Sequence, residues 1–154
     1  MAKNPFSDVG EKLTAAEIAE TAATLGIVIP DEVAEHYVAH NGGTPARPCW
    51  EQNDYEPSCV SEFLPIKHAT KGGLSVERSY RNGVEKGFLP QGLVPFAVDW
   101  SGNYFCFDED GHVYFYAIDA WSDRLSNEEN RKKAARLLSR SFKTFVERLV
   151  PEDQ

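Results

Sequence analysis

The stretch that most constrains this chain runs from Leu93 to Trp121, where the pattern predicts three consecutive β-strands joined by two turns. Asp99–Asn103 is typical of the first turn, and Asp108–Gly111 suits a four-residue hairpin turn with Gly111 in the left-handed conformation. Apolar and aromatic residues fill the three segments predicted as strands, at 93–98, 104–107 and 112–118. Because the first strand is apolar on both faces, other elements must cover this meander.

Helical patterns precede the meander and supply part of that cover. Thr14 and Glu17 form a T-x-x-E capping box at the start of a helix that Gly26 ends. A second helix opens at Pro30, whose missing N–H would have no partner there anyway, and it stops at Asn41-Gly42-Gly43. Both helices carry an apolar stripe that can pack on a sheet.

The segments between these helices and the meander have weaker patterns. Thr44 to Pro57 predicts an irregular loop with a short edge strand near Cys49-Trp50, and Val60 to Ile66 predicts a strand. Leu74 to Asn82 predicts a short helix, with Asn82-Gly83 as its stop.

The C-terminal segment begins with a second capping box, Ser126 with Glu129. Its apolar residues recur at helical spacing, at Ala134, Leu138, Phe142, Phe145 and Leu149. This pattern predicts one helix to Val150, or a helix broken near Ser139 to Ser141.

The order of elements is helices, then mostly strands, then a helix, without an alternating βα rhythm. This order predicts an α+β fold, a single domain with a mainly antiparallel sheet whose central meander is flanked by helices. We place the domain at residues 14–150 and a flexible lead-in at residues 1–13.

The composition of the chain argues against several classes of binding partner. The chain has 154 residues, 42% of them hydrophobic, and a formal net charge of −8, so it can bury a core and would repel nucleic-acid phosphates. The three cysteines are odd in number and not spaced as CxxC, so neither a disulfide framework nor a zinc knuckle is expected. With no secretory signal or membrane-span pattern, we expect a cytoplasmic protein without nucleic-acid or membrane partners.

None of the chemical patterns in the chain predicts catalysis, a cofactor or a metal. Asp108-x-Asp110-Gly111 resembles part of a calcium loop, but Cys106 and Ala117 would then stand where oxygen ligands are needed. His36 and His40 lie one helical turn apart without an obvious third zinc ligand. Ser101 has no local base, and no glycine loop has the context of a phosphate-binding motif.

Acidic residues are the other notable feature of the meander. No Lys or Arg occurs from Gly87 to Asp123, while carboxylates and tryptophans stand at the turns and after the last strand. Aromatic anchors surrounded by charge are what protein interfaces use, so this region favours binding of a basic partner. The alternatives are that the aromatics belong to the core and that the turn carboxylates cap their turns.

The motifs together resemble the SUKH superfamily, the family of the yeast Smi/Knr cell-wall-synthesis regulator and of many bacterial immunity proteins. The resemblance rests on three groups in order: Ile29-Pro30, Tyr37 and Asn41 to Pro45; then Leu93 to Asp99, Gly102 to Asp108 and Gly111 to Phe115; then Ser141-Phe142, Phe145-Val146 and Leu149. It implies an α+β domain without enzymatic activity. Trp100-Ser101 and the insertion Ala46 to Ser58 depart from the family pattern.

The resemblance implies an immunity protein that binds and neutralises a cognate toxin domain, often a nuclease. We expect partner contacts at Asp99, Trp100, Asp108, Glu109, Asp110, Asp119 and Trp121. The alternative is a regulatory interaction or scaffold module with no toxin partner, as the yeast relatives suggest. A hydrolase using the turn carboxylates is a third hypothesis.

Overall fold

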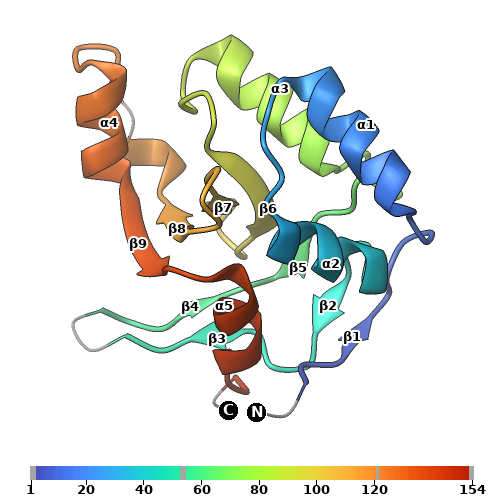
Figure 1. Ribbon diagram of the computed structural model, residues 1–154. Helices are drawn as coiled ribbons and strands as arrows, with labels where there is room; N and C mark the ends of the chain where they lie inside the picture. Colours follow the sequence, from blue (N-terminus) through green and yellow to red (C-terminus); the bar gives the residue numbers. More distant parts are fainter. Residues whose placement is uncertain (1–2, 53–54, 121, 153–154) are drawn as a thin grey trace.

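Five antiparallel strands form the centre of the structure, a computed structural model that describes residues 3–52, 55–120 and 122–152 (Figure 1). They follow one another in the sheet in chain order: β5 (Glu62–Phe63), β6 (Val94–Val98), β7 (Tyr104–Phe107), β8 (Val113–Tyr116) and β9 (Ala135–Ser139). The predicted meander is therefore β6 to β8, and β5 and β9 extend it on either side. Within 60–66, where a strand was predicted, only β5 is a strand.

The first helix before the sheet begins and ends where the sequence indicates, and the second begins there but ends earlier than predicted. Thr14 and Glu17 cap each other at the start of α1 (Ala15–Leu25), and Gly26 ends it with a φ of 68°. The second helix, α2 (Asp31–Ala39), starts directly after Pro30. Neighbouring residues set both ends of α1, which is why the sequence alone predicted them, whereas α2 ends at Ala39 because His40 is already extended, before the predicted stop at Asn41-Gly42-Gly43.

One part of the core lies where α2 and the last helix, α5 (Phe142–Arg148), pack on the sheet. The ring of Phe96 lies 4.9 Å from that of Phe142 and 5.8 Å from that of Phe145. Tyr37 of α2 is fully buried and donates its hydroxyl to the carbonyl of Leu64 at 2.8 Å. Aromatic packing of this kind holds the helices against one face of the sheet.

Residues of β8 alternate between that face and the opposite one. Phe115 packs against Phe105, which in turn packs against Phe145 of α5. Its neighbour Tyr116 points the other way and donates its hydroxyl to the carbonyl of Phe88, in the segment after α3 (Val76–Lys86). The meander is thus covered on both faces, as its apolar composition requires.

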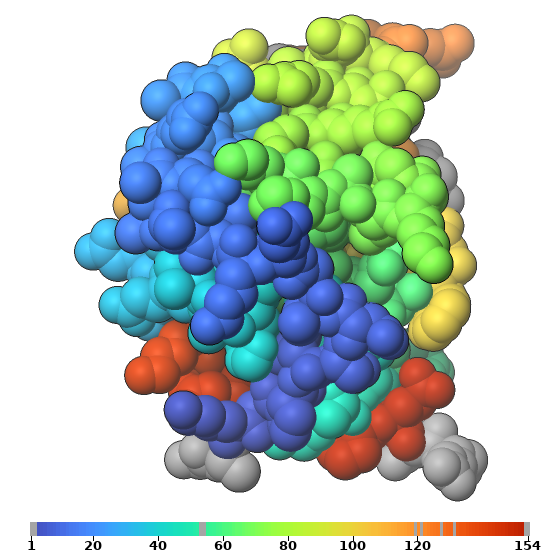
Figure 2. All heavy atoms as spheres, turned by 90° about the vertical axis from the view of Figure 1, so that its right-hand side faces the viewer, coloured from blue at the N-terminus to red at the C-terminus, as the bar shows by residue number. Residues whose placement is uncertain are grey.

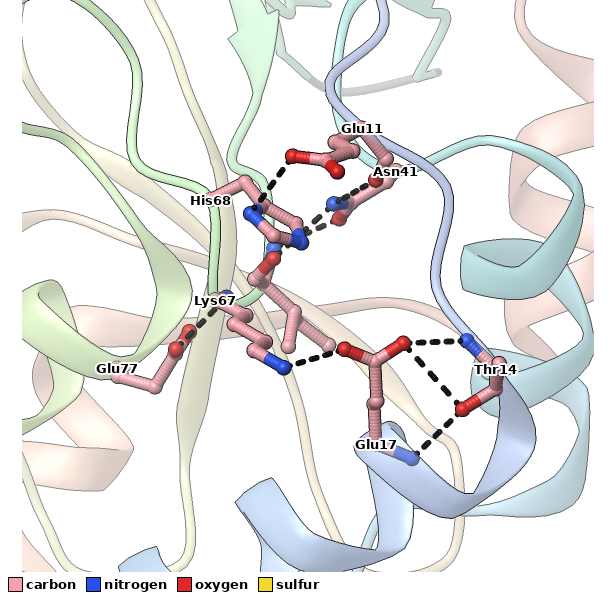
Figure 3. A network of polar contacts seen from close by, with 8 residues as sticks. Glu11, Thr14, Glu17, Asn41, Lys67, His68 and Glu77 are labelled. Atoms are coloured by element: carbon pink, nitrogen blue, oxygen red, sulfur yellow. Dashed lines mark hydrogen bonds and ion pairs between the residues drawn. The ribbon is translucent and has the colours of Figure 1, made fainter.

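Asn41 joins three segments that are far apart in sequence (Figure 3). Its side-chain amide donates to the carbonyls of Glu11 and Ile66, and its oxygen accepts from the Ile66 amide at 2.7 Å. The next two residues must be glycine, because a Cβ on Gly42 would meet the Phe63 carbonyl at 3.0 Å, and both have positive φ. The Asn-Gly-Gly motif is therefore a structural junction.

The segment before Thr14, which we predicted to be flexible, has specific contacts in the structure. Its strand β1 (Phe6–Ser7) pairs with β2 (Thr44–Pro45), and the amide of the buried Asn4 donates to the Arg47 and Val146 carbonyls. Figure 2 shows the segment spread over one face of the molecule, beside α1. How far it moves in solution stays a prediction.

The helix α3 does not stop at Asn82-Gly83, as predicted, but continues to Lys86 and ends at Gly87. Gly83 is buried inside it because the chain folds back there, so that a Cβ on Gly83 would lie 2.7 Å from the Cβ of Leu89. The glycine allows close packing against Leu89, and this contact could not be predicted from the residues next to Gly83 in sequence.

The C-terminal segment is neither one helix nor two halves of one helix. It consists of α4 (Asn127–Ala134), the strand β9 and α5, with Ser141 capping α5 through the Thr144 amide. Residues 135–139 form a strand because they pair with the edge of β8. Arg136 of this strand also contacts a distant segment, with its guanidinium 4.0 Å from the centre of the Tyr55 ring. Tertiary pairing thus overrides a helical pattern.

The expectation about disulfides was wrong for one pair of cysteines. Cys49 of β3 (Cys49–Trp50) and Cys59 of β4 (Ser58–Cys59) lie directly opposite each other and form a disulfide, while Cys106 is buried and takes no part in it. The spacing of the cysteines did not show that the intervening loop folds back as a hairpin. The disulfide removes one ground for the cytoplasmic prediction.

No helix within the described residues has both the length and the apolar character that crossing a bilayer requires.

Candidate functional site

The predicted contact residues are divided between the two ends of β7. One turn joins β6 to β7 beside the pair Val98 and Tyr104, and the other joins β7 to β8 beside the pair Phe107 and Val113. The four residues of β7 separate the turns by about 13 Å at ~3.4 Å per residue. The structure therefore forms two patches where the sequence suggested one acidic region.

At the first turn, the Asp99 carboxylate shapes the backbone. Its Oδ1 accepts from the amides of Ser101 and Asn103, at 2.9 and 2.8 Å, and its Oδ2 accepts from the Asn103 side chain. Trp100 projects from this framework with 79% of its surface exposed. Asp99 thus holds the turn that presents Trp100.

The short helix η1 (Ile118–Ala120) lies at the same end of the sheet. Its first residue, Ile118, donates its amide to the Asn103 side chain at 3.3 Å. Asp119 belongs to η1, so its backbone lies close to the Trp100 turn, but its side chain and Trp121 lie outside what the structure describes.

At the second turn, Asp108 is 8% exposed and has a structural role. Its Oδ1 accepts from the amides of Asp110 and His112, both at 3.0 Å, and its Oδ2 accepts from the Tyr114 hydroxyl. Gly111 takes the left-handed conformation predicted for it, with a φ of 81°. Glu109 and Asp110 are exposed at the tip and can reach a partner.

One contact at the second turn was not predicted. The carboxylates of Asp108 and Asp110 and the imidazole of His112 converge, with ligand atoms within 4.8 Å of one another. The sequence signal is the D-x-D-x-H spacing, of which the resemblance to a calcium loop uses only Asp108, Asp110 and Gly111.

The other candidates for chemistry are not assembled into a reactive group. Asp99 and Asp108 stand at opposite ends of β7, and the backbone of each turn uses their oxygens. The His36 ring packs among the aromatic rings of Phe6, Phe63 and Phe142, at centroid distances of 5.1 to 5.5 Å. Burial, with the positive charge of His40, lowers the pKa of His36 to about 3.

Comparison with protein families matches the chain to the SMI1/KNR4 family (SUKH-1) over residues 12–148. The chain belongs to this family. The matched range runs from just before α1 to the end of α5, so it includes both turns of the SUKH-1 meander. Searches of curated proteins and of solved structures found no significant match.

Membership of SUKH-1 confirms the resemblance read from the motifs and fits an immunity-protein or Smi1/Knr4-like role. The α+β architecture of this SUKH-1 chain is likewise the one predicted. Of the residues that carry the resemblance, Asn41, Phe96, Phe105 and Phe107 are buried, while Trp100 and the tip of the second turn lie at the surface.

Proposed function

We propose that this SUKH-1 domain is a non-catalytic immunity protein that binds a basic toxin domain and blocks its active site or substrate groove. The observation that carries the proposal is Trp100, which is 79% exposed on a turn that Asp99 holds in place. An exposed tryptophan on a fixed turn gains much by burial in a partner and loses little conformational freedom.

The acidic residues of the two turns and of η1 support a basic partner. Asp119 belongs to η1, which lies at the same end of the sheet as Trp100. Glu109 and Asp110 are exposed at the other end. A nuclease groove built for phosphates accepts carboxylates, and such charges steer association. Asp99 and Asp108 contribute their negative charge to this surface while their oxygens hold the turns.

One partner can reach both patches. A standard interface buries about 800 Å² on each side, which corresponds to a disc about 30 Å across. The length of β7, about 13 Å at ~3.4 Å per residue, falls within this span. We therefore place both turns and the segment from Asp119 to Trp121 in one interface.

Co-expression tests the proposal. The protein encoded beside this gene is expressed in bacterial cells with and without the chain, and survival is counted. We expect the neighbour to be toxic alone and harmless with the wild-type chain, whereas Trp100→Ala loses protection. Val28→Ala is the matched control, because Val28 is also exposed, at 55%, but lies on the link between α1 and α2.

A non-toxic neighbour would contradict the immunity role and favour the regulatory module. Equal protection by wild type and Trp100→Ala, at equal protein levels and down to limiting expression, would contradict the placement of the interface.

A further inference from the structure

Asp108, Asp110 and His112 surround one small volume on the β7–β8 turn. The Asp108 Oδ2 and His112 Nδ1 atoms are 3.4 Å apart, and the Asp110 carboxylate completes a group whose ligand atoms lie within 4.8 Å of one another. Two atoms bound to the same tetrahedral Zn²⁺ at about 2.05 Å are separated by about 3.3 Å. The Asp108–His112 pair already has this spacing.

Two of the three donors are held by the fold. The Asp108 carboxylate is fixed by two backbone amides at Oδ1, and the Tyr114 hydroxyl donates to Oδ2 at 3.0 Å. The Asp108 and His112 side chains are only 12% and 31% exposed, so their positions are restricted. Donors oriented in this way by outer hydrogen bonds are typical of metal-binding residues.

The group opens into a cavity. The cavity has a volume of about 510 Å³, and its walls include Gln91, Gly92 and Glu109 beside the three donors. It therefore has room for an ion together with the water molecules that complete its coordination. This distinguishes the turn from a closed ion pair in which nothing else fits.

We propose that Asp108, Asp110 and His112 bind a divalent transition-metal ion of the zinc type, with water in the remaining coordination positions. A set of one imidazole and two carboxylates suits Zn²⁺, whereas Ca²⁺ and Mg²⁺ prefer oxygen ligands throughout. The proposal differs from the sequence prediction of no metal, which compared this turn only with a calcium loop and left His112 out. It does not depend on the proposed toxin partner.

The chain offers a matched control for the alternative, an ion pair between His112 and Asp108. His68 Nδ1 lies 3.3 Å from Glu11 Oε2, nearly the same separation, but this pair belongs to no three-residue ligand group among the described residues. A weak site made by any histidine–carboxylate pair would bind at both places.

The experiment is a titration of the full chain, freed of metal with EDTA and with the Cys49–Cys59 disulfide intact, with Zn²⁺ by calorimetry and with Co²⁺ by absorption. We expect one equivalent of each ion, a visible Co²⁺ band of four-coordinate intensity, and no comparable binding of Ca²⁺. His112→Gln and Asp110→Asn should each weaken binding by more than tenfold, whereas His68→Gln should leave it unchanged.

Tyr114→Phe separates the metal site from a general effect on folding. It removes only the hydroxyl that orients Asp108, so we expect binding about 10- to 100-fold weaker with an unchanged circular dichroism spectrum. The proposal is overturned if the wild type takes up no Zn²⁺ at micromolar concentration, or if His112→Gln binds the ion as tightly as the wild type.

Discussion

Asn41 is a buried residue whose single side chain joins three separate segments of the chain. It satisfies the Glu11 carbonyl and both backbone groups of Ile66, and it is 3% exposed. Removing it leaves buried polar groups without partners, each of which costs about 1–3 kcal/mol. The motif gave no hint of these partners, because Ile66 is 25 residues away.

We therefore expect Asn41→Ala to lower the free energy of unfolding by about 3 kcal/mol, measured by urea denaturation. Asn82→Ala is the control, since Asn82 is exposed on α3 and alanine favours helix, so its stability should be unchanged or slightly higher. Equal stability of Asn41→Ala and the wild type would show that the junction is not needed.

The buried His36 leads to a second prediction at the scale of residues, which concerns the pH dependence of stability. The unfolded chain has the ordinary pKa of 6.5, and burial lowers the pKa in the folded protein to about 3. Below pH 6.5 the unfolded state therefore binds the proton more readily, so stability is complete above pH 6.5 and falls as the pH decreases toward 3. Between pH 6.5 and 4.5 this loss amounts to about 2 kcal/mol.

His36→Phe keeps an aromatic ring among Phe6, Phe63 and Phe142 and carries no titrating group. We expect this variant to lose about 2 kcal/mol less than the wild type over the same pH interval, measured by urea denaturation at each pH. A slope identical in His36→Phe and wild type would contradict the assignment.

At the scale of elements, Gly83 lies inside α3, beyond the predicted stop of this helix, and a substitution there tests the packing contact that it makes. Alanine favours a helix over glycine by about 1 kcal/mol, but here a Cβ would lie 2.7 Å from the Cβ of Leu89. Such overpacking costs about 1–3 kcal/mol, so the steric term wins.

We expect Gly83→Ala to lower stability by about 1 kcal/mol in thermal or urea denaturation. In Gly72→Ala the nearest atom is 3.8 Å away and φ is not positive, so stability should rise by up to about 1 kcal/mol. If Gly83→Ala were the more stable of the two, the packing argument would fail.

The strand β9 shows where sequence patterns reach their limit. Ala134, Leu138 and Phe142 have helical spacing, and nothing local reveals that residues 135–139 pair with β8. The meander was predictable because its alternation and both turns lie within one stretch of chain. Caps and turns could be predicted for the same reason, while β9 and the disulfide depend on segments distant in sequence.

In the candidate site, too, local features could be predicted from the sequence and features that depend on distant segments could not. The sequence identified the two turns, the strand between them and their acidic residues, but it left open whether Asp99 and Asp108 face a partner or cap their turns, and the structure shows that they cap them. Exposure of Trp100 is likewise a property of the assembled sheet, because its neighbours in sequence are equally compatible with a core tryptophan. The convergence of His112 on the carboxylates follows from the turn's conformation.

At the scale of the whole molecule, the net charge of −8 should act on the rate of association with a basic partner. For Glu109→Lys with Asp110→Lys we expect an association rate constant about tenfold lower at low salt, and a smaller dependence on ionic strength. Surface plasmon resonance in metal-free buffer measures both. Glu20→Lys with Glu85→Lys makes the same change of net charge on α1 and α3.

If steering depends on net charge alone, both double variants will slow association equally, and the second turn is then not part of the interface. The proposed placement requires the Glu109 and Asp110 pair to have the larger effect.

Hydrogen–deuterium exchange of the chain, free and bound to the product of the adjacent gene, tests the proposed interface most directly. We predict slower exchange in the complex at residues 99–103 and 108–111, at the two ends of β7, with little change in α1 and in the link around Val28. Protection confined to α1, or to the hairpin of β3 and β4, would contradict a partner surface centred on Trp100.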